Sequence, residues 1–454
     1  MNIATNIFLF ACMYIVLPLI YAMLLNLSKP KKNIILGVTL PYEARQEQDV
    51  QDVCRSYRKH LTATCLLLTV LFLGAFIPQY FSAAMTYMLT WLLLAIITPI
   101  VSYIIYHRKL KHLKQEHNWF CGATGKVMLD TKVSVQAAKK FSAWLFAPAV
   151  LLSWIPLMHE IYSNGGWDMV FLYGTMGLLV ALCYVCYRFL YRQKAEIVNS
   201  DTSLSIALTQ VRRYNWGKFW IVFSWVTAFF NLGMWLFIGS NVGILITTAA
   251  YTAIVLFIAI HTEFSTRKAQ ENLTADSGQD LYVDNDEHWL IGMFYHNPHD
   301  KHIIINDRVG INTTLNLAHP VGKAVMILSL LLLLAMPFFG LWIMNEEFTP
   351  VQLTLTDTAI EVRHITLSYS IRLEDIMSAE LLEELPPGVK IAGTGMDALL
   401  KGKFSLADIG NCELCLNPQT SPFIFIRTAN KAYVFCTNDS AQTRAVYGLL
   451  KGRL

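Results

Sequence analysis

Five side chains in one short segment could bind a metal ion. They lie in YHNPHDKHIIINDRVGINTTLNLAHP, residues 295–320, and are His296, His299, Asp300, His302 and His319. Imidazoles and carboxylates are common zinc ligands, and the spacing His-x-x-His-x-x-His could bring rings together. Pro298, however, breaks any helix that would align the three rings on one face. We therefore interpret the segment as a polar surface turn, and we expect neither a metal nor another cofactor.

The pair Cys412-x-x-Cys415 resembles half of a zinc or redox site. A zinc ribbon needs a second pair, and none is present in the sequence. If these residues lie in a strand, positions three apart point to opposite faces. Motifs for phosphate-binding loops, Ser-His-Asp hydrolases and HExxH metalloproteases are also missing, and GATGK at 122–126 lacks the phosphate-loop spacing. These features favour a protein without catalytic activity.

Long apolar runs recur along the chain of 454 residues, of which 54% are hydrophobic and 15% charged. Soluble proteins carry about 25% charged residues. A hydrocarbon core of about 30 Å requires about 20 apolar residues in a helix, and runs without alternation indicate helices rather than a barrel. The sequence therefore predicts an α-helical polytopic membrane protein with eight spans, Ile3–Leu27, Leu61–Phe81, Ala84–Tyr106, Phe141–Tyr162, Met169–Tyr191, Phe219–Ile238, Val242–His261 and Ala324–Met344.

Lysine and arginine predict the orientation of these spans. They gather in the segments 28–60, 107–140, 192–218 and 262–323, whereas the intervening short loops and the N-terminus contain none. The positive-inside rule places the basic segments in the cytoplasm, so both chain termini are expected outside. We expect a bacterial cytoplasmic (inner) membrane location. The basic loops would contact anionic lipid headgroups rather than nucleic acid.

Polar residues inside the spans bear on a transport mechanism. No Asp, Glu, Lys or Arg lies at the middle of a span, although ion-coupled carriers commonly place ionisable groups there. Asn231 is the main intramembrane candidate, with His159 and Glu160 at the outer end of the fourth span. We interpret Asn231 as a hydrogen-bonding contact between helices. Prolines at positions 18, 78, 99, 148, 156 and 337 permit kinks or breaks.

The last hundred residues differ from the rest. QLTLTDTAIEVR and ITLSYSIRL alternate in polarity, and SPFIFIRTANKAYVFCTND predicts a hairpin turning at 429–431. DSAQTRAVYGLL follows as a helix, with Asp439 or Ser440 at its N-cap. The pattern predicts a small β-barrel or sandwich closed by a terminal helix.

Two stretches resemble known families. The C-terminal domain resembles bacterial pleckstrin-homology-like domains in its hairpin at 351–373, its GTGM…GKFSL segment at 393–406, its strand pair and its final helix. This resemblance implies a partly open barrel capped by the helix, usually a binding or scaffolding domain.

The stretch 289–320, here called the pre-helix module, resembles a module of unknown function in bacterial multi-pass membrane proteins. The matching residues are Trp289, Phe294, Tyr295, Asn297, Pro298, Asp300, Arg308, Gly310, Thr313, Asn316, Ala318, His319 and Pro320. His296 and Asn312 depart from the usual aromatic and glycine. We expect short strands at HIIIND and GINTTLNLA. We also expect a bond from His319 to a backbone carbonyl, and Pro320 at the start of the last helix.

These features predict four regions. They are a seven-helix membrane region over 1–261, a cytoplasmic linker and module over 262–322, a last transmembrane helix over 323–345, and a pleckstrin-homology-like domain over 349–454. The first functional hypothesis is an envelope sensor, scaffold or immunity-type protein that binds a peptide, protein or envelope component through this domain. The second is a small-molecule or peptide transporter, and the third is a membrane-embedded enzyme.

Overall fold

Eight helices are long and apolar enough to cross a membrane. The computed structural model describes residues 3–30, 33–121, 140–163, 167–190, 202–274, 284–308, 313–365 and 367–454. Within these ranges the candidate spans are Leu9–Asn26, Gln48–Phe76, Phe81–Glu116, Ala143–Tyr162, Met169–Phe189, Ser203–Leu236, Val242–Gln270 and Pro320–Phe348. Each of the predicted spans has a counterpart, which confirms the fold class.

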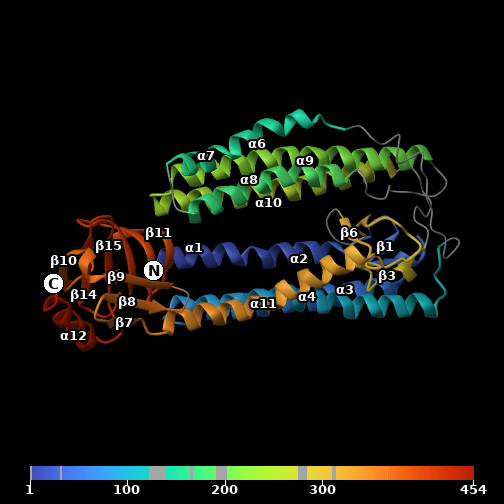
Figure 1. The fold of residues 1–454 in the computed structure, drawn as a ribbon. Helices are drawn as coiled ribbons and strands as arrows, with labels where there is room; N and C mark the ends of the chain where they lie inside the picture. Colours follow the sequence, from blue (N-terminus) through green and yellow to red (C-terminus); the bar gives the residue numbers. More distant parts are fainter. Residues whose placement is uncertain are drawn as a thin grey trace. The chain divides into compact units, whose positions relative to one another are not determined.

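Several of the helices, which Figure 1 labels, extend beyond the predicted spans. They are α1 (Ile3–Tyr14), α2 (Val16–Asn26), α3 (Gln48–Phe72), α4 (Phe81–Glu116), α6 (Ala147–Ser153), α7 (Ile155–Tyr162), α8 (Trp167–Leu190), α9 (Thr202–Leu236), α10 (Asn241–Thr274), α11 (Pro320–Phe348) and α12 (Ser440–Lys451). The second span forms one helix with the polar segment before it, while Phe81, predicted at its end, begins α4 instead. α10 continues to Thr274, inside the region 262–322 that the sequence predicted as a cytoplasmic linker and module.

Prolines interrupt two of the spans. The fourth predicted span consists of α6 and α7, which are separated at Trp154, and each of these helices carries a proline at its first or second position. α1 and α2 are likewise separated at Ile15. Pro99 and Pro337 instead lie inside α4 and α11.

Asn231 lies on α9, which packs against α6, α8 and α10. Its side chain is fully buried. The Nδ2 atom donates to the carbonyl oxygen of Ser153 at 2.7 Å. Ser153 is the last residue of α6, where the fourth span is interrupted. Asn231 therefore provides a hydrogen bond between helices, as the sequence predicted, and it contacts the broken span.

The contacts within the chain define two compact units, which we describe separately. The first comprises Met1–Tyr14, Thr69–Leu93 and Leu334–Leu454, and the second comprises Ile15–Leu68 and Leu94–Leu333. The boundaries fall inside α3, α4 and α11, so each of these helices contributes one end to each unit.

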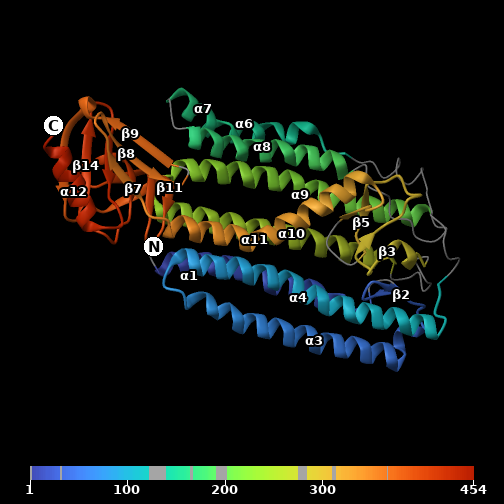
Figure 2. The same cartoon turned by 60° about the horizontal axis from the view of Figure 1, so that its bottom comes forward.

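The C-terminal domain in the first unit is built from two sheets and one helix (Figure 2). Its strands are β7 (Gln352–Leu355), β8 (Ala359–His364), β9 (Leu367–Arg372), β10 (Ile376–Leu382), β11 (Gly388–Gly395), β12 (Leu400–Leu406), β13 (Gly410–Leu416), β14 (Phe423–Thr428) and β15 (Ala432–Phe435). One sheet has the order β7-β8-β9 and the other β10-β14-β15-β13-β12-β11. β13 and β15 are parallel. β14 and β15 form the predicted hairpin, and Asp439 is the N-cap of α12.

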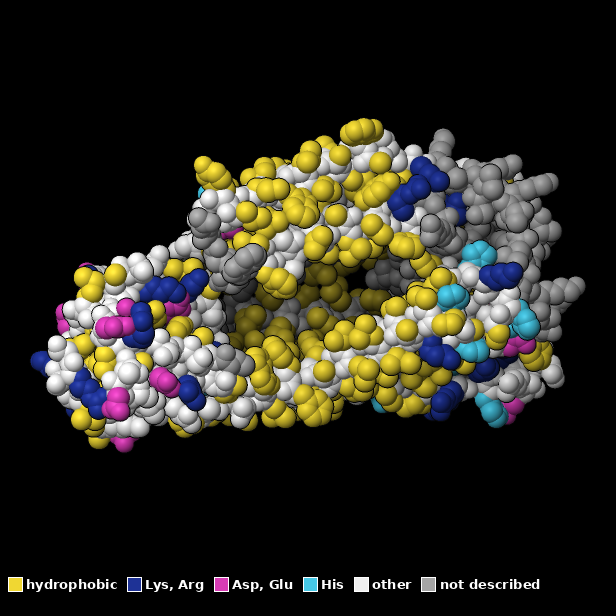
Figure 3. Space-filling model, in the orientation of Figure 1, with side chains coloured by type: hydrophobic (Ala, Val, Ile, Leu, Met, Phe, Trp, Pro, Cys, Tyr) yellow, Lys and Arg dark blue, Asp and Glu magenta, His cyan; other side chains and the backbone are white. Residues whose placement is uncertain are grey.

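The sheets enclose an apolar core that includes residues of both sheets and of α12. Ile360 of β8, Ile424 of β14 and Leu450 of α12 belong to this cluster. Cys415 points into it, whereas Cys412 belongs to a second apolar cluster. The Cys-x-x-Cys residues therefore lie on opposite faces of β13, as strand alternation predicts. Apolar side chains dominate the surface of the helices, whereas charged side chains gather on the C-terminal domain (Figure 3).

The thiols of the C-terminal domain should resist alkylation. Burial raises the pKa of Cys412 to about 11 and the pKa values of Cys415 and Cys436 to about 12. Since the thiolate is the reactive species, we expect no maleimide labelling of these cysteines at neutral pH until the protein unfolds. Mass spectrometry of full-length protein in detergent would measure this. A Met377→Cys variant provides the reactive control, because Met377 is 71% exposed. Labelling of the native thiols at the control's rate would contradict the buried packing.

Candidate functional site

The pre-helix module folds as two short strand pairs in the second unit. β3 (Trp289–Leu290) pairs with β4 (Phe294–Tyr295), and β5 (Ile304–Asn306) pairs with β6 (Thr313–Leu315). A bridge between Tyr295 and Asn316 joins the pairs. The predicted strands at HIIIND and GINTTLNLA are confirmed. The turn between β3 and β4 requires glycine at position 292, where φ is +70° and an added Cβ would lie 2.8 Å from the His107 ring.

Asn316 organises the backbone of the module. Its Nδ2 atom donates to the carbonyl oxygens of Asn297 and Asp300, both at 2.9 Å. Its Oδ1 atom accepts from the backbone amides of Asn297 and Ala318, both at 3.1 Å. Asn316 is 1% exposed, so these bonds satisfy an amide that would otherwise be costly to bury. The residue acts by fixing the chain rather than by presenting a group to a ligand.

A second network surrounds Asp300. Its Oδ2 atom accepts from the Tyr295 hydroxyl at 3.1 Å, and its Oδ1 atom lies 2.8 Å from the Nδ1 atom of His302. The Asn297 Nδ2 atom donates to the Tyr295 hydroxyl at 3.2 Å, while its Oδ1 atom accepts from the His299 amide and holds the turn at Pro298. Burial raises the pKa of Tyr295. The phenol therefore keeps its proton at neutral pH and donates a hydrogen bond to Asp300.

The histidines of the opening segment point to different partners. His296, Pro298 and His299 lie on the surface, and His302 faces Asp300. The Nδ1 atom of His319 accepts from the Val321 amide at 3.2 Å. The predicted bond from His319 to a carbonyl is therefore wrong: the ring caps the first turn of α11, which begins at Pro320 as predicted. No group of three metal-ligating side chains occurs among the described residues.

Arg308 and Trp289 connect the module to a buried set of charges. The Arg308 guanidinium lies 5.6 Å from the Trp289 ring centroid, and the Trp289 and Tyr295 ring centroids are 5.3 Å apart. Gly310, the other predicted residue near this turn, lies outside the described residues. Arg308 is 7% exposed, and a buried guanidinium requires a negative partner.

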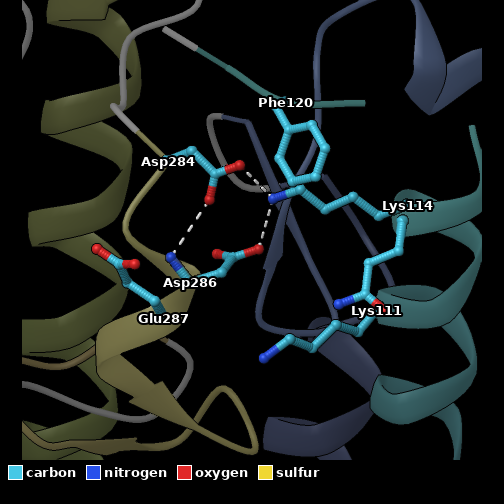
Figure 4. A pocket seen from close by; sticks show the side chains of 7 residues that line it. Lys111, Lys114, Phe120, Asp284, Asp286 and Glu287 are labelled. Carbon is cyan, nitrogen blue, oxygen red and sulfur yellow. Dashed lines mark hydrogen bonds and ion pairs between the residues drawn. The ribbon is translucent and has the colours of Figure 1, made fainter. Parts of the chain in front are cut away.

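That partner is Asp286, at the centre of an ion-pair cluster made by Lys114, Asp284, Asp286 and Arg308. The Asp286 Oδ1 atom lies 2.5 Å from the Nη2 atom of Arg308, and its Oδ2 atom lies 2.7 Å from the Nζ atom of Lys114. Lys114 also pairs with Asp284 (Figure 4). The four side chains are between 3% and 11% exposed. Two cations and two carboxylates balance, so the cluster is electrically neutral.

Thr39 completes the coordination of Asp286. Its hydroxyl donates to the Oδ1 atom at 2.8 Å, and its amide donates to the Oδ2 atom at 3.1 Å. The Arg308 Nη2 atom also donates to the Thr39 hydroxyl. Burial alone would raise the pKa of Asp286, but Arg308 and Lys114 outweigh it and lower the pKa to about 2. The carboxylate is therefore ionised at every physiological pH.

A tight hairpin places Thr39 at this position. β1 (Ile34–Ile35) pairs with β2 (Val38–Thr39), and the connecting Leu36 and Gly37 both have positive φ. Such values are typical of the turns that join two-residue hairpins. The Leu36 carbonyl accepts from the Tyr103 hydroxyl at 3.2 Å and lies 2.8 Å from the Nδ1 atom of His107. Residues of α4 thereby hold the hairpin in place.

The ion-pair cluster joins segments that are distant in the sequence. Thr39 belongs to the first predicted cytoplasmic segment, Lys114 to the end of α4, and Asp286 and Arg308 to the segment before α11. Sequence reasoning selected Trp289 and Arg308 but missed Thr39, Lys114, Asp284 and Asp286. The two aspartates stand just before Trp289 in the sequence DNDEHW. The acidic residues directly before Trp289, in a segment otherwise predicted as a folded module, were the available signal.

A cavity of about 230 Å³ adjoins the cluster. Its lining residues are Lys111, Lys114, Gln115, Phe120, Asp284, Asp286 and Glu287. Lys111 and Glu287 lie outside the ion-pair contacts in Figure 4, and Phe120 lies over the Lys114 ammonium at 5.5 Å. The two buried carboxylates, Asp284 and Asp286, are already paired with cations. This arrangement suits a structural connection better than acid–base catalysis, which needs a group that titrates near neutral pH.

A second set of carboxylates lies in the first unit, at the end of α11. Glu347 accepts from the Ser82 amide at 3.3 Å and from the Ala398 amide at 2.9 Å. Asp397 accepts from the Phe81 amide at 2.8 Å. Phe81 and Ser82 are the first residues of α4, so both carboxylates cap a helix N-terminus, where negative charge is favourable.

Glu346, beside Glu347, pairs with Lys401 of β12. We name Glu346, Glu347 and Asp397 the carboxylate clasp. The sequence placed the two glutamates after the last helix, but α11 continues to Phe348 and includes them. The clasp therefore connects the end of α11, the start of α4 and the C-terminal domain.

Replacing Asp286 should destabilise the protein in a pH-dependent way. Asp286→Asn leaves two buried cations without their shared carboxylate, which costs roughly 3–5 kcal/mol for a buried pair. The folded pKa of about 2 lies below the ordinary value of 3.8. The contribution of the carboxylate is therefore complete above about pH 4 and is lost as pH falls towards 2.

Thermal unfolding in detergent between pH 7 and pH 3 would measure this effect. We expect a lower Tm for Asp286→Asn at pH 7 and a smaller difference from wild type at acidic pH. The control is Asp52→Asn, because Asp52 and its partner Arg55 are 50% and 63% exposed and such pairs contribute little. A difference that grows as the pH falls would contradict the assignment.

Comparison with known proteins identifies one region of the chain. Residues 351–443 match the family described as Bacterial PH domain. Searches of curated proteins and of solved structures found no significant match. The match confirms the expected pleckstrin-homology-like domain, and the resemblance of the pre-helix module stays a prediction. The chain is a polytopic α-helical membrane protein with a bacterial PH domain near its C-terminus.

Proposed function

We propose that the protein is a non-enzymatic receptor of the bacterial cytoplasmic membrane, of the sensor, scaffold or immunity type. Its C-terminal domain would bind a peptide, protein or envelope component outside the cell, and the pre-helix module would face the cytoplasm. The family match at residues 351–443 supports a binding domain. β9 and β11 are edge strands of its two sheets, and an edge strand can pair with an extended peptide.

The contacts within each unit agree with the side of the membrane that the distribution of Lys and Arg predicts for each segment. Thr39, Lys114 and Asp286 come from three segments predicted to be cytoplasmic, and Thr39 and Lys114 both contact Asp286. Phe81 lies at the end of a loop predicted to be external, and it touches Asp397 of the C-terminal domain. Groups in contact outside the bilayer must share one side of it. The absolute direction rests on the positive-inside rule.

The observation that carries the proposal is the carboxylate clasp. Glu347 accepts bonds from both α4 and the C-terminal domain, while Phe81 of α4 and Ile343 of α11 pack against the core of that domain. A ligand that shifts the loop 396–399 between β11 and β12 would therefore act directly on the contacts at the start of α4 and the end of α11.

The same two helices also reach the pre-helix module. The last turns of α4 contribute Lys114 to the ion-pair cluster, and α11 begins at Pro320, immediately after Asn316 and His319. We propose that binding outside is transmitted along α4 and α11 to this module. Covalent continuity alone does not establish energetic coupling, so this step requires a direct measurement.

The alternative hypotheses have less support. A transport site at Asn231 would need a substrate to reach that side chain, yet the side chain is fully buried and its Nδ2 atom donates to the Ser153 carbonyl. A membrane-embedded enzyme would need a titratable or nucleophilic group. Asp286 is instead paired with Arg308 and Lys114. These cations lower its pKa, so that it does not titrate near neutral pH.

Loss of the charges of the carboxylate clasp should increase amide hydrogen exchange in the pre-helix module. We expect the double variant Glu347→Gln/Asp397→Asn to increase amide hydrogen exchange several-fold at 81–85, because two helix-capping charges are lost. If the helices transmit this change, exchange should also rise at 284–308. Mass-detected exchange on full-length protein in nanodiscs would show both regions. Glu361→Gln is the matched control in the same domain, since Glu361 pairs only with an exposed arginine there.

Two results would contradict the proposal. A change confined to 81–85 would remove the transmission step. An unchanged cellular phenotype after deletion of residues 349–454, tested by growth under envelope stress and peptide-toxin challenge, would remove the receptor function itself.

A further inference from the structure

A small cavity in the second unit lies between three cationic side chains. It has a volume of about 10 Å³, and its lining residues are Asn26, Leu27, Lys29, Ile34, Leu36, Gly37, Arg267 and Arg308. A volume of this size accommodates about one oxygen atom, because a buried water needs about 10–15 Å³. The cavity is separate from the one beside Lys114, with which it shares no lining residue.

Arg308 has an unused donor at this cavity. Its Nη2 atom is engaged by Asp286 and Thr39, but its Nη1 atom has no hydrogen-bond partner among the described residues. The side chain is 4% exposed. A buried guanidinium donor without an acceptor is costly, and the adjoining cavity leaves room for an acceptor from outside the chain.

The surrounding charges favour an anionic acceptor. Asp286 balances Arg308, and Glu263 balances Arg267 at 2.6 Å. Lys29 is exposed and adds a positive charge at the edge of the cavity. Phosphate oxygens accept charge-assisted hydrogen bonds from guanidinium groups, and phosphate is a preferred ligand of arginine.

The position of the cavity favours a lipid as the source of the phosphate. Asn26 and Leu27 stand at the end of α2, a membrane-spanning helix, and Arg267 lies within three residues of the end of the span Val242–Gln270. Basic pockets between spans at the cytoplasmic face bind the headgroups of anionic lipids. We propose that a phosphate oxygen of an anionic phospholipid enters this cavity, accepts from the Arg308 Nη1 atom, and leaves the rest of the headgroup beside Lys29.

This inference gives the pre-helix module a second role. Arg308 would contact the lipid through one nitrogen and Asp286 through the other. Lipid binding would then stabilise the ion-pair cluster by satisfying the remaining donor. The inference depends on the module lying near the headgroups and does not depend on what the C-terminal domain binds.

Native mass spectrometry of the full-length protein in detergent would test the proposal. Phosphatidylglycerol, phosphatidylcholine and inorganic phosphate would each be titrated as probes. Two variants report on the site: Lys29→Gln removes the outer cation, and Arg308→Lys keeps the charge beside Asp286 but removes the second nitrogen donor. Lys59→Gln is the matched control, because Lys59 is an exposed lysine on α3.

We expect the wild type and Lys59→Gln to retain one phosphatidylglycerol with equal affinity and to bind phosphatidylcholine more weakly. Loss of one charge-assisted hydrogen bond should weaken retention about tenfold in Arg308→Lys, and Lys29→Gln should also weaken it. Since Lys29 is exposed, that variant should fold even if Arg308→Lys does not, and thermal unfolding would check both. Displacement of the lipid by millimolar phosphate would assign the site to a soluble phosphate and overturn the lipid source. Equal retention by all variants would overturn the site itself.

Discussion

The carboxylate of Asp286 is the constraint on which the second unit depends. A buried charge is tolerated only where opposite charges and hydrogen-bond donors surround it, and here the partners come from three distant segments. Arg308 lies in the pre-helix module, Lys114 lies in the last turn of α4, and Thr39 lies in the first hairpin. Among the described residues, the apolar cluster of the module itself consists of Trp289, Tyr295 and Ile305. The carboxylate therefore joins this small module to the first hairpin and to α4.

The carboxylates of the clasp perform a related task in the first unit. Glu347 and Asp397 hold the first residues of α4, while Glu346 holds Lys401 of the C-terminal domain. α4 is therefore fixed at its start by negative charges and at its end by a lysine within the ion-pair cluster. α4 is thus one helix held at both ends by polar contacts, in a chain with few charges inside its spans. Under the proposed function it is the physical path from the C-terminal domain to the pre-helix module.

The sequence predicted the spans, the strands of the module and the C-terminal domain because each depends on local composition. Bilayer thickness determines the length of an apolar run, and alternation indicates a half-buried strand. Helix ends were less predictable, since α3 and α10 continue into polar segments whose residues also favour helix. The ion-pair cluster could not be derived, because Lys114 and Asp286 are separated by 172 positions and pair only after folding. Arg308 was selected by resemblance, without its partners.

Cysteine accessibility in intact cells is the most direct test of the central claim, that the binding domain and the pre-helix module lie on opposite sides of the membrane. Met377, 71% exposed in the C-terminal domain, and His112, 72% exposed near the end of α4, are suitable positions. A membrane-impermeant maleimide should label the Met377→Cys protein in spheroplasts and the His112→Cys protein only after lysis. Labelling of both before lysis, or of neither, would place the two sites on one side and contradict a receptor that signals across the membrane.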